Sequence, residues 1–194
     1  MNERGYLRRL PAEFYRGDAW VHWVMTIQDR RQGYCDPRFL YKFRELQTHI
    51  GFRYQIACVV YCLMPDHMHF LWTGLTPETD QLVAAKAIRR ELNRCLERIQ
   101  FRLQAQAYDH VLKSEEVEGN AVETIAEYIA RNPERKGLIP VDHFARYPYT
   151  GCLIPGFPSL RLFGERGWDD VWRTIAYLRR TELFRYPDPN RQPN

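Results

Sequence analysis

Hydrophobic residues follow a strand-like pattern in three stretches of the first half of the chain. Aromatic and β-branched side chains dominate residues 19–27, 53–63 and 67–73. The last two stretches are separated only by Met64-Pro65-Asp66, a break short enough to join them as a hairpin. We therefore expect a sheet that contains at least one antiparallel pair.

Helical spacing of apolar residues predicts helices over residues 37–50, 80–99, 121–131 and 168–180. Pro133 has no backbone donor, so the third helix should end or bend near Asn132. A weaker strand is expected over residues 102–113. Residues 140–158, which contain several prolines and glycines, indicate a loop.

The resulting order of elements, β-α-β-β-α-β-α, favours an α+β fold. It predicts an antiparallel sheet with helices packed mainly on one face, and a ferredoxin-like sandwich is the simplest architecture with this order. We expect residues 1–150 to form one domain. Residues 151–194 would be a C-terminal extension whose single helix packs on that domain.

The composition is that of a folded chain without membrane segments. Hydrophobic residues make up 45% of the 194 residues and charged residues 27%, which excludes a disordered protein. No apolar run approaches the roughly 20 residues of a transmembrane helix. Residues 1–10 are polar and carry arginines, with no apolar signal-peptide stretch. We therefore expect a cytoplasmic protein with no membrane partner.

The basic residues are mostly arginine, since only four of the 28 are lysines. Arginine forks match phosphate oxygens, so a nucleic-acid surface explains the bias, and so does a GC-rich genome. A row of basic residues on the 80–99 helix fits a phosphate-facing surface, although a solvated helix face is the commoner explanation. Its members are Lys86, Arg90, Arg94 and Arg98.

The five cysteines include no CxxC pair, so neither a zinc ribbon nor a disulfide framework is indicated. Cys58 and Cys62 lie four residues apart in the stretch 53–63. Because side chains alternate along a strand, both should point to one face as small apolar residues. We interpret all five as free thiols.

The segment 67–73 places two histidines on one side of a strand. His67 and His69 should face one way, and Met68, Phe70 and Trp72 the other, as a core face. The two Cα atoms would lie about 6.5–7 Å apart, so both imidazoles can converge on one divalent cation. Two such ligands hold a metal weakly, so at least one more is required. For an isolated His-x-His, a half-exposed structural pair on a sheet is the commoner explanation.

Tyr128 and Asn132, four residues apart, share one face of the helix over 121–131. Tyr128 is a candidate covalent nucleophile toward phosphorus. A phenol ordinarily ionises well above neutral pH, so such a reaction needs a group that polarises the phosphate, such as a metal. Asn132 can offer its side-chain oxygen to that metal. A packing role is the common alternative for a helical tyrosine, and the chain has 12 tyrosines.

Two longer motifs carry a family resemblance. The segment 61–71 (YCLMPDHMHFL) resembles the signature of the IS200-like, REP-associated tyrosine transposases, which are single-tyrosine members of the HUH (His-hydrophobic-His) endonuclease superfamily. The segment 128–139 (YIARNPERKGLI) is similar to a second signature of that family, YIxxNPxxxGL. The stretch 108–113 (YDHVLK) resembles a block between them. The match covers roughly residues 20–150, with motif order and separation also preserved.

The resemblance implies an HUH endonuclease-like fold, a catalytic domain over residues 1–150 and a set of residue roles. His67, His69 and Asn132 would bind Mg²⁺ or Mn²⁺ near the scissile phosphate. Tyr128 would attack phosphorus and leave a 5′-phosphotyrosine link and a free 3′-hydroxyl. The substrate would be single-stranded DNA next to a hairpin such as a REP palindrome.

Other roles are less closely tied to the motifs. Residues that would contact DNA include His110 in the shared block and three from the basic row, Lys86, Arg90 and Arg94. His22 is interpreted as structural or as an accessory ligand, and Asp66 as a cap for the turn before the histidine strand.

Several alternatives to this metal-dependent DNA-nicking enzyme stay open. One is a non-catalytic regulator that binds hairpin DNA on the same scaffold, and another is a hydrolase that activates water. The sequence leaves open a monomer or a homodimer, and whether Tyr128 acts on its own subunit's histidines. The DNA sequence that is recognised is also left open.

Overall fold

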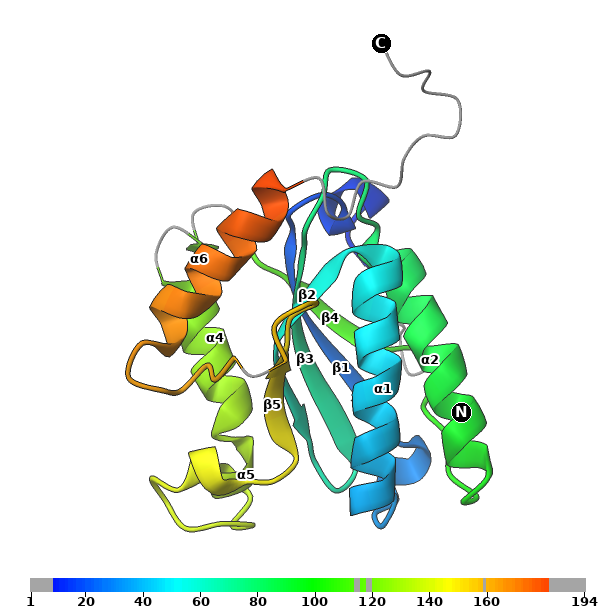
Figure 1. Cartoon of the computed structure of the whole chain (residues 1–194). Coiled ribbons are helices and arrows are strands. Elements are labelled where there is room, and N and C mark those ends of the chain that lie inside the picture. The colour runs from blue at the N-terminus through cyan, green and yellow to red at the C-terminus, as the bar shows by residue number, and fades with distance from the viewer. Residues whose placement is uncertain (1–8, 114–115, 118–119, 159, 182–194) are drawn as a thin grey trace.

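The computed structural model describes residues 9–113, 116–117, 120–158 and 160–181. Within these residues one five-stranded antiparallel sheet has the order β4-β1-β3-β2-β5 (Figure 1). Its strands are β1 (Trp20–Thr26), β2 (Ile56–Leu63), β3 (His67–Gly74), β4 (Tyr108–Val111) and β5 (Thr150–Leu153). The predicted hairpin is confirmed as the β2–β3 pair, and β3 lies at the centre of the sheet.

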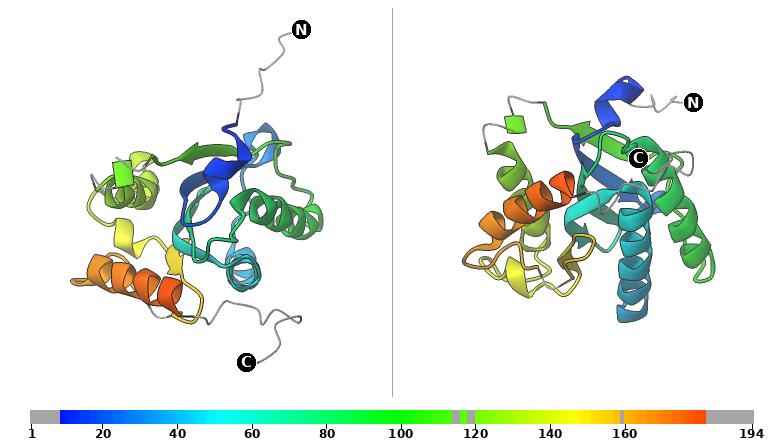
Figure 2. Two further views of the ribbon diagram at one scale, coloured as in Figure 1. Left: turned by 90° about the horizontal axis from the view of Figure 1, so that it is seen from above. Right: turned by 45° about the horizontal axis from the view of Figure 1, so that its top comes forward.

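Helices cover both faces of the sheet, as the view from above shows (Figure 2). On one face lie α1 (Pro37–Tyr54) and α2 (Gln81–Glu97), and on the other α4 (Ala121–Ala130) and α6 (Gly167–Arg180). The short elements are α5 (Asn132–Arg135), η1 (Ala12–Tyr15), η2 (Gln28–Arg30) and η3 (Phe144–Arg146). The α+β class is confirmed. The expectation of helices mainly on one face is wrong, since the two pairs lie on opposite faces.

The alternation of β3 explains why both faces need a cover. Met68, Phe70 and Trp72 belong to the core beneath α1 and α2, as predicted. Leu71 lies in a second core with α4 and α6. Since an apolar sheet face is stabilised only when another element removes it from water, the second face requires its own helices.

The last third of the chain contains a strand that the sequence pattern does not predict. β5 lies in the segment 140–158, which was expected to be a loop, and pairs with β2 at the edge of the sheet. The predicted boundary between residues 150 and 151 therefore falls inside β5. α6 packs against the core that α4 shares with the sheet. The expected strand over 102–113 is shorter, with β4 limited to four residues.

A bulge in β2 changes the faces of two cysteines. The β2–β3 register shifts between Cys58 and Val60. As a result Cys58 lies in the core beneath α1 and α2, whereas Cys62 lies in the opposite core. The expectation that both face one way is wrong, because the extra residue of a bulge reverses the alternation. All five cysteines are free thiols, as predicted.

The helix ends follow local sequence signals. The carboxylates of Asp36 and Asp80 accept hydrogen bonds from the first turns of α1 and α2, which typically stabilises a helix end by about 1 kcal/mol. α4 ends at Ala130, and Pro133 lies in the first turn of α5, so the predicted break near Asn132 is confirmed. In the described part of the chain, no helix is both long and apolar enough to cross a bilayer.

Candidate active site

Three histidines lie on the face of the sheet that α4 and α6 cover. His67 and His69 project from β3, and His22 from β1. Antiparallel pairing places Val24 opposite His69 and His22 opposite Leu71, so His22 is the diagonal neighbour of His69 on the same face. All three are buried, with 8%, 6% and 8% of the surface of His22, His69 and His67 exposed.

The ring nitrogens of these histidines form a continuous chain of contacts. Nε2 of His67 lies 2.9 Å from Nε2 of His69. Nδ1 of His69 lies 3.0 Å from Nε2 of His22. Each β3 histidine therefore turns its Nε2 toward the other, while its Nδ1 is held by a different residue.

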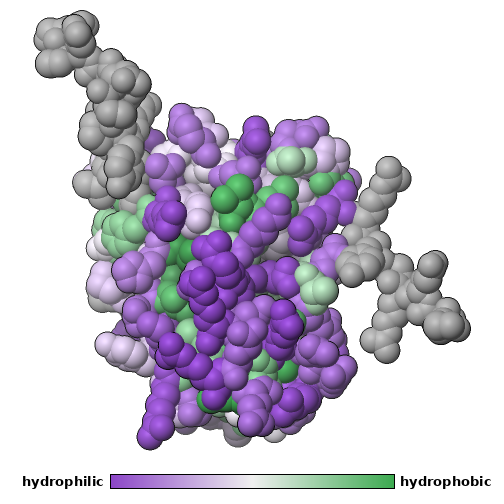
Figure 3. Space-filling view, turned by 90° about the vertical axis from the view of Figure 1, so that its right-hand side faces the viewer, coloured by the Kyte–Doolittle hydropathy of each residue, from purple (hydrophilic) through white to green (hydrophobic). Residues whose placement is uncertain are grey.

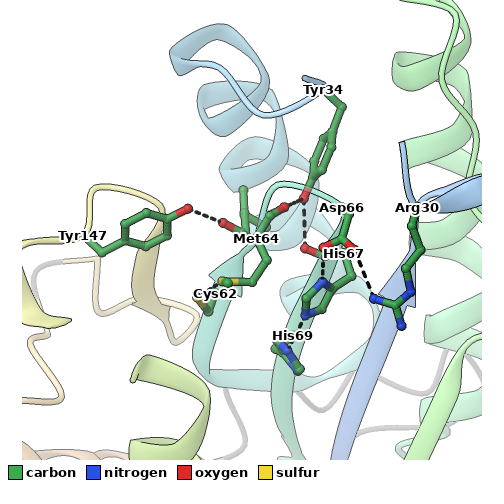
Figure 4. A network of polar contacts seen from close by, with 9 residues as sticks. Arg30, Tyr34, Cys62, Met64, Asp66, His67, His69 and Tyr147 are labelled. Atoms are coloured by element: carbon green, nitrogen blue, oxygen red, sulfur yellow. Dashed lines mark hydrogen bonds and ion pairs between the residues drawn. The ribbon is translucent and has the colours of Figure 1, made fainter. Parts of the chain in front are cut away.

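Asp66 contacts His67, the outermost histidine in this series of ring contacts (Figure 4). Nδ1 of His67 donates to Oδ1 of Asp66 at 2.6 Å, and Nη1 of Arg30 donates to Oδ2 at 3.0 Å. The Tyr34 hydroxyl donates to the carbonyl oxygens of Met64 and His67, which fixes the turn before β3. The Asp66 side chain was expected to cap the turn, but it instead orients the His67 ring.

The charges of these groups follow from burial and hydrogen bonding. Burial lowers the pKa of His22 to about 4, with a smaller contribution from His110. Burial also lowers the pKa of His69 well below its ordinary value, and the neighbouring His22 and His67 act in the same direction. Burial alone would raise the pKa of the Asp66 carboxyl, but hydrogen bonds from His67 and Arg30 outweigh it and lower the pKa. At neutral pH, His22 and His69 are therefore neutral beside an ionised carboxylate.

α4 carries Tyr128 to this group of histidines. Its ring centroid lies 6.5 Å from that of His69 and 6.4 Å from that of His22, edge-on in both cases. Apolar residues of α4, including Val122, Ala126 and Ile129, are buried against the sheet, which fixes the helix. Tyr128 itself is 45% exposed, so it is open to a ligand from solvent.

Asn132 lies one helical turn beyond Tyr128 and is 7% exposed. Its Nδ2 donates to the carbonyl oxygens of Tyr128 and Ile129 at 3.1 and 3.2 Å. This orientation leaves Oδ1 as the atom that can bind a cation. Among the described residues, Asn132 makes no hydrogen bond to the histidines.

The donor atoms suit a divalent cation that binds nitrogen and oxygen. Two imidazoles whose Nε2 atoms face each other can supply nitrogen ligands, and their Nδ1 atoms are held by outer partners, as is usual for metal-binding histidines. No three His, Cys, Asp or Glu side chains in the described ranges form a metal-binding group. The amide oxygen of Asn132 is the candidate third protein ligand.

The basic row of α2 lies away from this group. Lys86, Arg90 and Arg94 are on a helix that covers the opposite face of the sheet, and Arg90 and Arg94 both pair with Glu91. The side of the molecule formed by α1 and α2 is mainly hydrophilic (Figure 3). The structure thus does not bring these residues to Tyr128, and their role in DNA contact stays a prediction.

His110 lies on β4 directly opposite His22, on the same face of the sheet. Its side chain is 44% exposed, and its Nε2 lies 3.9 Å from Oε1 of Glu116. His110 therefore extends the row of histidines to the open edge of the sheet.

Two further residues of the site were not singled out from the sequence. Arg135 on α5 places its guanidinium over the Tyr128 ring, with its central carbon 4.2 Å from the ring centroid. Arg30 holds Asp66, although 36 residues separate them. Arg135 could have been found from the sequence, because it lies inside the 128–139 motif at helical spacing from Tyr128. The position of Arg30 in the sequence gives no indication of its contact with Asp66.

Comparison with known proteins places the chain in a family. The model of the family "Transposase IS200 like" matches residues 16–132, more than half of the chain, and the chain belongs to that family of transposases. The matched region contains the three histidines, Tyr128 and Asn132. This confirms the resemblance noted in the sequence.

A solved structure shows a related fold. A REP-associated tyrosine transposase bound to a REP hairpin matches with a TM-score of 0.60 and 15% identity, over 88% of this chain and 87% of that one. A protein described as a transposase from Deinococcus radiodurans matches with a TM-score of 0.41 and 17% identity, over 66% of this chain and 97% of that one. No curated protein matches the sequence.

Proposed function

We propose that this transposase nicks and rejoins single-stranded DNA next to hairpins, with Tyr128 as the nucleophile and Mg²⁺ or Mn²⁺ as cofactor. The observation that carries the proposal is the position of Tyr128, whose ring lies 6.5 Å from that of His69 although 59 residues separate them in the chain. A tyrosine beside histidines that can hold a divalent cation fits phosphoryl transfer to tyrosine, because a bound cation polarises the phosphate that the nucleophile attacks.

The proposed reaction is a transesterification in two steps. The Tyr128 oxygen forms a bond to phosphorus while the bond from phosphorus to the 3′-oxygen breaks. The phenol proton passes to solvent, and the departing 3′-oxygen takes up a proton. A 3′-hydroxyl later reverses these changes and releases Tyr128, so the number of phosphoester bonds is conserved and no nucleotide cofactor is needed.

The residues around Tyr128 have distinct parts in this proposal. His67, His69 and Asn132 would hold the cation, which when bound polarises the phosphate and stabilises the leaving oxygen. Asp66 and Arg30 keep the His67 ring in place. Because Tyr128 lies beside the histidines of its own chain, we infer that the nucleophile acts with the histidines of the same subunit.

Hairpin DNA is the proposed partner. The solved transposase with the related fold is described as bound to a REP hairpin. The net charge of +4 and the predominance of arginine are consistent with a polyanionic ligand.

Replacing Tyr128 with Phe tests the nucleophile. The wild-type protein should yield protein-linked DNA on denaturing gels when incubated with hairpin DNA and Mn²⁺, and Tyr128→Phe should yield none while its hairpin affinity stays within about twofold. Cleavage by Tyr128→Phe would contradict the proposal. Tight binding without cleavage by the wild type would favour a regulator, and released 5′-phosphate without a protein link would favour a hydrolase.

A further inference from the structure

His22 contacts His69 on the side of the ring that faces away from His67. The contact joins Nε2 of His22 to Nδ1 of His69, whereas Nε2 of His69 faces His67. The two nitrogens of an imidazole point to opposite sides of the ring. His22 therefore cannot share with His67 a cation that lies at Nε2 of His69, and it belongs to the outer shell of the site.

The direction of each hydrogen bond follows from Asp66. The ionised carboxylate only accepts, so Nδ1 of His67 carries a proton. When the rings are neutral, Nε2 of His67 then accepts from Nε2 of His69. His69 in turn has no proton on Nδ1, so Nε2 of His22 donates to it.

With neutral rings, this arrangement leaves His69 unable to bind a cation through Nε2, because that nitrogen carries the proton. Both Nε2 lone pairs become available only if His69 holds its proton on Nδ1 instead. Nε2 of His22 must then accept where it previously donated. Each ring keeps one N–H proton throughout, so the change is one of tautomer and not of charge.

We propose that His22 is a positioning residue that sets the tautomer of His69, donating to Nδ1 without a cation and accepting from Nδ1 when Nε2 binds one. The inference rests on the proposed metal-binding function of His67 and His69. It follows that position 22 needs a side chain that can both donate and accept. A histidine satisfies this, and so does a glutamine, whereas a phenylalanine of similar size does not.

Nitrogen-15 NMR of the full chain tests the tautomer directly. Spectra that correlate ring nitrogens with carbon-bound protons distinguish the two neutral forms. His69 should carry its proton on Nε2 in EDTA and on Nδ1 with saturating Mg²⁺. The same tautomer in both conditions would overturn the inference.

Calorimetric titration with Mn²⁺ tests the role of position 22. His22→Phe should weaken Mn²⁺ binding about 10- to 100-fold, the usual effect of losing an outer-shell partner, and His22→Gln should recover most of it. His49→Phe, at an exposed histidine of α1, is the matched control and should bind as the wild type does. The near-ultraviolet circular dichroism of each variant checks that it is folded.

Three outcomes of the titration would also overturn the inference. Equal losses in His22→Gln and His22→Phe would make His22 a direct ligand, and no loss in either would leave it without a role. A wild-type protein that binds no Mn²⁺ would also overturn it. The proposed DNA reaction is judged separately by the Tyr128–DNA link, which can be absent while the order of the Mn²⁺ affinities holds.

Discussion

The guanidinium of Arg135 covers one face of the Tyr128 ring, with 4.2 Å between its central carbon and the ring centroid. Its Nη1 also lies 3.5 Å from the carbonyl oxygen of Tyr128, at the limit of a hydrogen bond. Within the described ranges Arg135 has no ion pair, although its neighbour Arg131 pairs with Glu127, Glu134 and Asp142. The positive charge of Arg135 therefore lies next to the candidate nucleophile and is exposed to solvent, where it can contact a phosphate of bound DNA.

Arg135→Gln should slow formation of the Tyr128–DNA link about three- to tenfold, because loss of a cation–π contact of roughly 1 kcal/mol frees the ring and removes a charge. Single-turnover rates on denaturing gels, at saturating hairpin DNA, measure this effect. Lys136→Gln is the matched control, since Lys136 is also exposed and forms no cation–π contact with any ring of the described residues. Equal rates for the two variants would contradict the role of Arg135.

The stability of the folded protein should fall in mild acid because of His22. Burial lowers its pKa to about 4 from the ordinary 6.5. Between these pH values the unfolded chain binds a proton that the folded chain does not. The free energy of unfolding should therefore decrease as the pH falls through this range, by up to about 1.4 kcal/mol per pH unit.

Denaturant unfolding in EDTA at pH 7 and at about pH 5 measures this dependence. His22→Gln removes the titrating ring, so its loss of stability between the two pH values should be smaller than that of the wild type. If the two proteins lose the same amount, His22 is not the neutral buried group described above.

The position of Tyr128 beside His69 of its own chain predicts a reaction within one subunit. A mixture of the inactive variants Tyr128→Phe and His69→Ala should then form no link to DNA, because neither chain has both residues. The yield of protein-linked DNA from the mixture, compared with each variant alone, is the measurement. Recovery of activity in the mixture would show that the tyrosine of one subunit acts with the histidines of another.

The basic row of α2 should affect binding but not the chemical step. Substituting Gln for Lys86, Arg90 and Arg94 should weaken hairpin binding and reduce its salt dependence, by a slope of about one for each lost phosphate contact. The rate at saturating DNA should not change, since α2 lies on the face away from Tyr128. Unchanged affinity and salt slope would show that α2 is only a solvated helix.

The sequence was sufficient for features that depend on local periodicity. The alternation of residues 67–73 correctly placed His67 and His69 on one face of the strand and Phe70 and Trp72 on the other face, because the side chains of a strand have a fixed period of two. Pro133 located the end of α4 through its missing donor. These signals need no knowledge of the partner strand or helix.

Features that depend on tertiary pairing could not be predicted in this way. β5 is four residues long and includes Gly151, and its pairing with β2 is visible only in the fold. The contact between His22 and His69 requires the β1–β3 register, which sets which residues are diagonal neighbours. Leu71 and its neighbours are buried beneath α4 and α6. A strand that is buried on both faces has a nearly continuous run of apolar residues, so its sequence pattern does not show that a second face needs helices.

Mass spectrometry of a proteolytic digest, after incubation of the wild-type protein with hairpin DNA and Mn²⁺, tests the central claim most directly. The account predicts a peptide that carries a 5′-linked nucleotide on Tyr128 and a matching DNA fragment with a free 3′-hydroxyl. Cleaved DNA with an unmodified Tyr128 peptide, or a nucleotide on any other residue, would contradict it.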